Sequence, residues 1–271
     1  MNFLLLTALK AEANPLIKRF NLKRDLKTQL FINKNISLLI TGIGKVKTQA
    51  RIKSIIDLKN NWDETILVNI GIAGGKKNKT KIGSMYFINK ILDEEIGNIF
   101  FPDVLIKHNL EETSLTTVLK SVTSDNYKYS GLVDMEASMI FELISSYTTC
   151  HRLVFLKIVS DYMDISDWKS INVQNLIHKQ IENISKIMNS YNNQNLSNRI
   201  ILDNVEINLL TKYSEKLKLT KTQSMQLMLL SENFKKNNGL IVGLDSYFKQ
   251  RPKSKQERNK VFDKIKKYLS S

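Results

Sequence analysis

Short apolar runs alternate with amphipathic segments through the first 190 residues of the chain. Uninterrupted apolar runs are typical of strands buried on both faces, whereas apolar residues at three- and four-residue spacing predict helices. The sequence predicts strands over residues 3–8, 36–41, 65–70, 81–91 and 153–159, and helices over residues 10–20 and 48–58. This alternation predicts an α/β fold with a parallel or mixed sheet covered on both faces.

The remainder of the chain predicts helices only. Two capping-box patterns occur there, Thr220 with Gln223 and Ser254 with Glu257, and each precedes a run of apolar residues at helical spacing. A polar stretch over residues 189–195 separates this part from the first. We therefore predict a catalytic-type domain over residues 1–192 and a helical C-terminal extension over residues 193–271. The apolar faces of the extension should pack on the first domain or on a second subunit.

The positive charge is concentrated in the extension. The formal net charge of the chain is +15, and residues 193–271 contribute 16 Lys or Arg against 7 Asp or Glu. Lysine, which predominates, is less suited than arginine to bidentate phosphate binding, so a solvated basic surface is the favoured interpretation. A nucleic-acid partner for residues 193–271 is the less favoured alternative, because zinc-ligand spacing and aromatic-rich patterns are missing from that sequence.

Cysteine and hydropathy place limits on the environment. The single cysteine, Cys150, cannot form a disulfide within the chain, which favours a reducing compartment, and we expect a cytoplasmic protein. No apolar run approaches the roughly 18 residues that a membrane span needs, so we expect no membrane association. The apolar N-terminus lacks a basic leader and is interpreted as a buried strand. The three histidines show no ligand spacing, and we predict no metal site.

Two glycine-rich turns are predicted to follow strands, over residues 42–44 and 71–75. Backbone N–H groups exposed in such turns can bind phosphate or sugar oxygens. The first turn lacks the third glycine of a dinucleotide fingerprint, and neither turn is followed by Gly-Lys-Ser/Thr. Together they indicate a ligand site at the carboxyl edge of the sheet.

Carboxylates also follow predicted strands. Asp134 and Glu136 come after one apolar run, and Asp161 follows Ser160 at the end of another. Each acid taken alone could cap the helix after it. As a set, acids at several strand ends suggest a site that stabilises positive charge.

Five segments occur in the order and approximate spacing found in one known family. They are Ala8-Leu9-Lys10-Ala11-Glu12, Gly42-Ile43-Gly44-Lys45-Val46, Asn69-Ile70-Gly71-Ile72-Ala73-Gly74-Gly75, Val133-Asp134-Met135-Glu136-Ala137 and Ile158-Val159-Ser160-Asp161. Over residues 1–190 the chain resembles the methylthioadenosine/S-adenosylhomocysteine nucleosidase branch of the nucleoside phosphorylase superfamily. The resemblance implies a three-layer α/β/α sandwich with a mixed, partly barrel-like sheet. It also implies a homodimer that cleaves the N-glycosidic bond of an adenine-type purine nucleoside without a cofactor.

The resemblance assigns roles to individual residues. Glu12 would position the attacking water, Glu136 would hold the ribose hydroxyls, and Asp161 would protonate purine N7. The remaining substrate contacts would come from Met135, Ser160, Ile72, Ala73 and Gly74. Asp134 is expected to be structural. Three acids suit the reaction because the sugar becomes cationic, oxocarbenium-like, while the leaving base needs a proton.

Two alternatives and several departures accompany this interpretation. A purine nucleoside phosphorylase would need phosphate ligands, and none of the four arginines before residue 199 lies in the glycine turns, so hydrolysis is favoured. The other alternative is a catalytically inactive nucleoside-binding protein whose tail binds nucleic acid or protein.

The sequence departs from the family pattern at three places. Ile72 replaces a small hydroxyl residue and Lys157 replaces an arginine, and the family's Gly-Asp-x-Phe base-contact motif is missing.

Overall fold

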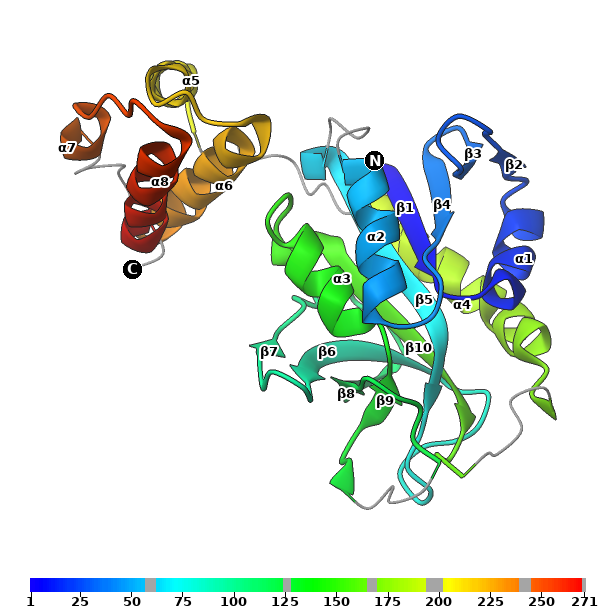
Figure 1. Ribbon diagram of the computed structural model, residues 1–271. Coiled ribbons are helices and arrows are strands. Elements are labelled where there is room, and N and C mark those ends of the chain that lie inside the picture. Colours follow the sequence, from blue (N-terminus) through cyan, green and yellow to red (C-terminus); the bar gives the residue numbers. More distant parts are fainter. Residues whose placement is uncertain (57–61, 124–127, 165–169, 194–201, 239–244, 270–271) are drawn as a thin grey trace. The chain divides into compact units, whose positions relative to one another are not determined.

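The computed structural model describes residues 1–56, 62–123, 128–164, 170–193, 202–238 and 245–269 (Figure 1). The chain divides into two compact units, Met1–Asn195 and Leu196–Ser271. Among the described residues, no helix has both the length and the apolar character required to cross a bilayer.

A ten-stranded mixed sheet forms the centre of the first unit. Its long strands are rich in β-branched and other apolar residues, and their side chains are almost entirely buried. The strands are β1 (Asn2–Thr7), β2 (Lys23–Arg24), β3 (Phe31–Asn33), β4 (Ile36–Ile40), β5 (Thr65–Gly74), β6 (Met85–Asp93), β7 (Ile99–Phe100), β8 (Glu111–Thr117), β9 (Leu132–Asp134) and β10 (Leu153–Asp161).

Part of this sheet closes on itself. β5 pairs with both β10 and β9, and the path from β10 through β6 and β8 returns to β9. β1 continues the sheet from the other part of β5 toward β4, β3 and β2. The prediction of a mixed, partly barrel-like sheet is therefore confirmed.

Helices cover the sheet on both faces (Figure 1). α1 (Lys10–Arg19) packs against α4 (Val173–Asn193), and both contact the strands beneath them. α2 (Lys45–Ile56) packs against α3 (Ala137–Ile144), which lies on β6, β8 and β10. Short 3-10 turns occupy Trp62–Glu64 and Cys150–Arg152. This arrangement confirms the predicted α/β/α layers.

Two predicted strand ends were wrong in a way that matters for the site. β5 continues to Gly74, so most of the predicted glycine-rich turn over residues 71–75 is strand. β10 continues to Asp161, which is the last residue of the strand and does not lie beyond it. Both extensions exist because Gly74 pairs with Asp161 on one side and with Val133 on the other. Pairing partners distant in sequence stabilise strand residues that local propensity disfavours.

Other boundaries differ by a few residues. β6 begins at Met85, not at residue 81, because the chain turns at Gly83 with φ of +83°. The short strands β2, β3, β7 and β9 were not resolved as separate elements by the sequence pattern. The end of the second predicted helix, residues 57–58, lies outside the described residues.

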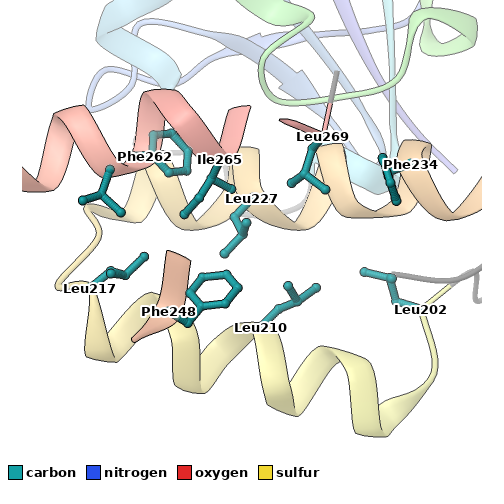
Figure 2. Close-up of a cluster of buried hydrophobic side chains, with 10 residues drawn as sticks. Leu202, Leu210, Leu217, Leu227, Phe234, Phe248, Phe262, Ile265 and Leu269 are labelled. Atoms are coloured by element: carbon teal, nitrogen blue, oxygen red, sulfur yellow. The ribbon is translucent and has the colours of Figure 1, made fainter. Parts of the chain in front are cut away.

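The described part of the second unit forms four helices with a core of their own (Figure 2). They are α5 (Asn204–Lys216), α6 (Lys221–Asn238), α7 (Asp245–Phe248) and α8 (Lys255–Leu269). Gln223 N–H donates to Thr220 Oγ1 and Glu257 N–H donates to Ser254 Oγ, so both predicted helix starts carry the expected cap. The core contains Leu202, Leu210, Leu217, Leu227, Phe234, Phe248, Val261, Phe262, Ile265 and Leu269. The helices thus cover each other's apolar faces.

Candidate active site

A cavity of about 310 Å³ opens in the first unit where β5, β9 and β10 end. All eight residues that the sequence nominated lie along its wall: Glu12, Ile72, Ala73, Gly74, Met135, Glu136, Ser160 and Asp161. They come from α1, β5, the segment between β9 and α3, and β10. Strand pairing brings segments up to 150 residues apart in sequence to this edge of the sheet.

Glu12 is held by the backbone. It lies in the first turn of α1, and its Oε2 accepts hydrogen bonds from the N–H groups of Ala8 and Leu9, each at 2.8 Å. Its Oε1 accepts a hydrogen bond from Ile72 N–H at 2.9 Å. Burial raises the pKa of Glu12, although the three N–H donors and Lys157 oppose that rise. The result is a rigid, buried carboxyl group whose orientation is determined by β5.

Gly71 permits this close approach. A methyl group at its Cα would lie 3.0 Å from Glu12 Oε1 and 3.6 Å from Lys157 Nζ. Lys157 is buried, and its Nζ lies 2.8 Å from Asp134 Oδ2. Asp134 also accepts hydrogen bonds from Thr117 Oγ1 at 2.7 Å and from Ala137 N–H at 3.0 Å. Because Ala137 is the first residue of α3, Asp134 caps the first N–H of that helix, although the N-cap position itself is Glu136.

Glu136 turns away from its own helix. It makes no side-chain cap to α3, and its Oε1 accepts a hydrogen bond from Gly44 N–H at 2.7 Å. Gly44 has φ of +86°, a conformation that disfavours any residue with a side chain. Burial, followed by the nearby Asp134 carboxylate, raises the pKa of Glu136 to about 7. The carboxyl group can therefore change its charge near neutral pH.

A second ion pair braces the Gly44 turn. Lys45 Nζ lies 2.7 Å from Asp93 Oδ1 and 3.0 Å from Glu95 Oε2. Asp93 Oδ2 accepts a hydrogen bond from Ser138 Oγ at 2.6 Å. The network joins the start of α2, the end of β6 and the start of α3. It keeps Gly44 and Glu136 together without entering the cavity.

Asp161 has two fixed partners. Its Oδ1 accepts a hydrogen bond from Met163 N–H at 2.7 Å, and its Oδ2 is in hydrogen-bond contact with Ser160 Oγ. Ser160 Oγ also lies 3.3 Å from the carbonyl oxygen of Ala73. Met163 has φ of +59°, an uncommon conformation for a residue other than glycine. This turn aims the Asp161 carboxyl group across the end of β5.

Solved structures share this architecture. The 5′-methylthioadenosine/S-adenosylhomocysteine nucleosidase of Helicobacter pylori is 14% identical, with a TM-score of 0.58 over 70% of this chain and 98% of that chain. The 5′-methylthioadenosine nucleosidase of Arabidopsis thaliana is 20% identical, with a TM-score of 0.58 over 72% of this chain and 98% of that chain. The enzyme of Streptococcus pneumoniae is 13% identical, with a TM-score of 0.58 over 70% of this chain and 100% of that chain.

Over about 70% of its length the chain shares the fold of these enzymes. The likeness at these identities concerns the fold, and it confirms the architecture that the resemblance implied. No protein-family model matches the sequence, and no curated protein matches it significantly.

The structure adds cavity residues that sequence reasoning did not nominate. Val118, Ser121 and Val122 follow β8, Ile43 lies in the Gly42–Gly44 turn, and Met163 follows Asp161; all of them line the cavity. Val118 and Met163 pack with Val133 in a small apolar cluster, with Met135 and Val122 at its edge. Val118 directly follows a strand and could have been found by that rule. Ser121 and Val122 have no local signal, since only the closure of the ring brings them here.

The cavity wall is acidic. Its charged residues are Glu12, Asp134, Glu136 and Asp161, and Lys and Arg do not occur among the described residues that line it. Lys157 lies behind the wall and partly compensates these charges. No group of three or more His, Cys, Asp and Glu side chains suited to a metal ion occurs within the described part of the chain. The cavity is thus lined by carboxyl groups and apolar side chains.

Proposed function

We propose that this chain hydrolyses the N-glycosidic bond of a purine nucleoside of the adenine type and releases the free base. The observation that supports the proposal is the convergence of Glu12, Glu136 and Asp161 on one cavity of a nucleosidase fold. A cavity of about 310 Å³ is within the range of small-molecule sites. Its apolar cluster around Val118, Met163 and Met135 suits the faces of a purine.

Glu12 is proposed to position the attacking water. A carboxylate offers about four acceptor positions, and three backbone N–H groups occupy three of those on Glu12. Oε1 bears the remaining one. A water bound there would be held by a carboxyl group that cannot rotate away. The raised pKa of Glu12 makes it a stronger base than an exposed glutamate.

Glu136 is proposed to hold the ribose hydroxyls. Gly44 N–H occupies one acceptor position, which leaves the others for two hydroxyl donors. In its ionised form the carboxylate also stabilises the positive charge that develops on the sugar. Because its pKa is about 7, ligand hydroxyls would favour the ionised form on binding.

Asp161 is proposed to deliver a proton to purine N7. Ser160 Oγ donates a hydrogen bond to Asp161 Oδ2 and lies 3.3 Å from the Ala73 carbonyl oxygen. Its hydroxyl can instead turn to that carbonyl and accept a hydrogen bond from Asp161 when the acid carries the proton. When Asp161 loses its proton, the serine hydroxyl can turn and donate to the carboxylate. Both protonation states of Asp161 therefore have a matching hydrogen bond.

The acidic wall argues against phosphorolysis. A phosphorylase must bind a phosphate anion beside the sugar, and such sites usually contain arginine or lysine. The charged groups that line the described cavity are all carboxyl groups, which repel phosphate. Hydrolysis is therefore the proposed reaction, and phosphate dependence is the observation that would favour the alternative.

The direct test is chromatographic detection of free base. Purified protein is incubated with 5′-methylthioadenosine, S-adenosylhomocysteine, adenosine or inosine, with and without phosphate. We expect adenine to be released from at least one adenine nucleoside at a rate independent of phosphate. Strict phosphate dependence would establish the phosphorylase, and tight binding of a nucleoside without turnover would establish an inactive binding protein.

Two variants connect the reaction to the site. Glu12→Gln and Asp161→Asn should each lower kcat by about 10²–10⁴-fold, the usual contribution of a general acid or base. Glu142→Gln and Asp164→Asn change exposed acids nearby and serve as matched controls. A glutamine side chain cannot accept all three hydrogen bonds that Glu12 receives from backbone N–H groups. The folding of the Glu12→Gln protein is therefore checked by circular dichroism. Full activity in both site variants would overturn the assigned roles.

The homodimer is likewise a proposal from the resemblance. Ile43 lines the cavity yet is 49% exposed, and Val46 in the first turn of α2 is 77% exposed. An apolar surface at the mouth of a site suits a subunit contact. Sedimentation equilibrium should give twice the chain mass, and a monomer at all concentrations would remove this proposal.

A further inference from the structure

The strongest concentration of charge lies in the second unit, around α8. Residues 249–267 contain nine Lys or Arg and two acids. Four of the basic residues, Lys249, Arg251, Lys253 and Lys255, alternate along the segment that leads into α8, and all four are exposed. Five more, Arg258, Lys260, Lys264, Lys266 and Lys267, follow within α8.

The two faces of α8 differ sharply. Val261, Phe262, Ile265 and Leu269 are buried in the core of the unit, and Figure 2 shows the last three of them. The exposed lysines at positions 260, 264 and 267 have i, i+4 and i+7 spacing, so they form one stripe on the outer face. At 1.5 Å per residue this stripe is about 10 Å long.

Three acids of this unit have partners other than the lysines of the stripe. Asp263 Oδ1 lies 2.8 Å from Lys266 Nζ, and Glu257 Oε2 accepts a hydrogen bond from Lys253 N–H at 2.7 Å. Glu206 Oε2 lies 2.6 Å from Lys235 Nζ. Within the described residues, the three lysines of the outer stripe make no ion pair. Their charged ends are exposed to solvent.

We propose that this basic surface, residues 249–267, binds the phosphate backbone of nucleic acid. The partner must present regularly repeated negative charge over at least the length of the stripe, and nucleic acid carries about one charge per 1.7 Å of duplex. Lysines act as point charges for phosphate, and such contacts position a protein without reading sequence. The surface belongs to the second unit, whereas the cavity belongs to the first, and it would add a second binding activity to the proposed hydrolysis.

The burial of the apolar face of α8 favours nucleic acid over a membrane as the partner of this surface. An amphipathic helix that inserts into a bilayer does so with its apolar face, but the apolar face of α8 is packed in the core of the unit. The large apolar residues exposed on the described part of the unit, Val205, Ile207 and Leu209, belong to α5. Electrostatic contact with repeated phosphates therefore fits the surface better than lipid insertion.

The test uses the full chain and a fluorescein-labelled 20-base-pair DNA duplex, with the same sequence as duplex RNA in a parallel arm. Fluorescence anisotropy is measured between 50 and 200 mM salt. We expect binding that weakens as salt rises. The variant Lys260→Gln/Lys264→Gln/Lys267→Gln should remove about three phosphate contacts. Between 50 and 200 mM salt the wild type should therefore lose about 40 times more affinity than this variant does.

A matched variant, Lys23→Gln/Lys27→Gln/Lys34→Gln, makes the same charge change at exposed positions of the first unit. It should keep the salt dependence of the wild type. Release of adenine should be unchanged in both variants, so failure here is distinguishable from failure of the proposed hydrolysis. Equal losses in the two variants, no binding at 50 mM salt, or stronger binding to phosphatidylserine vesicles would each overturn the proposal.

Discussion

Lys157 Nζ lies 2.8 Å from Asp134 Oδ2, and both side chains are almost completely buried. Burial opposes the charge on Lys157, but Asp134, Glu136 and Glu12 outweigh it and raise the pKa of the lysine above its usual value. The lysine is therefore charged, and it offsets the acids behind the cavity wall. The ion pair joins β10 to the end of β9, two residues before Glu136.

Removing this cation should destabilise the first unit. In Lys157→Met the Asp134 carboxylate would be left buried and unpaired, a change that typically costs about 3–5 kcal/mol of unfolding free energy. The loss should be smaller at pH 5 than at pH 8, because the pKa values of Glu12 and Glu136 are raised and these acids take up protons as pH falls.

Urea unfolding followed by tryptophan fluorescence measures this effect, since Trp62 is buried in the first unit and the other tryptophan of the sequence also precedes residue 195. Lys90→Met removes an exposed lysine from β6 and should change the free energy of unfolding by less than about 0.5 kcal/mol. A Lys157→Met protein as stable as the wild type at pH 8 would show that the ion pair makes no net contribution.

The raised pKa of Glu136 predicts a pH dependence of stability. With a pKa of about 7 in the folded state and 4.5 as the reference value, the folded protein binds more protons between these limits. The contribution is fully present below about pH 4.5 and is lost as pH rises through about 7. Between pH 5 and pH 8 the wild type should lose roughly 2–3 kcal/mol from this group.

Glu136→Gln should remove that part of the pH dependence, because glutamine does not titrate and still accepts a hydrogen bond from Gly44 N–H. Unfolding in urea at pH 5 and pH 8 gives the comparison. Glu142→Gln, an exposed change on α3, should leave the wild-type dependence intact. Parallel pH profiles for the Glu136→Gln protein and the wild type would contradict the raised pKa.

Ser160→Ala tests the hydrogen bond to Asp161. Loss of a hydrogen bond to a charged or proton-donating carboxyl group costs about 1.5–3 kcal/mol, which corresponds to a fall in kcat of about 10-fold or more. KM can rise as well, because Ser160 also lines the cavity and is expected to contact the substrate, so the role through Asp161 is judged by kcat. Steady-state kinetics on the best nucleoside provide the measurement. Ser145→Ala, at the end of α3, is the control, and an unchanged kcat in Ser160→Ala would exclude this role.

Phe262→Ala tests whether the helical unit folds on its own core. Phe262 is 2% exposed, and truncation of a buried phenylalanine costs about 3–5 kcal/mol. We expect the second unit to become sensitive to proteolysis while tryptophan fluorescence and adenine release stay normal. Val205→Ala, at a position that is 76% exposed, should have neither effect. Loss of adenine release in Phe262→Ala would show that the first unit depends on the second.

Local pattern was sufficient for the elements whose own residues specify them. The buried strand near the N-terminus, predicted over residues 3–8, is β1 at Asn2–Thr7, because an uninterrupted apolar run suits a strand covered on both faces. The caps at Thr220 and Ser254 form as predicted, because a helix start depends on residues three apart. The eight residues nominated from the order of motifs all line one cavity.

The sequence by itself thus determined the alternation of strands and helices, the separate helical unit and the acids that surround the cavity. The tertiary structure decided how far β5 extends, that Lys157 pairs with Asp134, and that Ser121 and Val122 reach the cavity wall. Glu12 takes its orientation from Ile72, sixty positions along the chain. Such contacts depend on which strands pair and in which register, and the pattern of neighbouring residues carries little information about either.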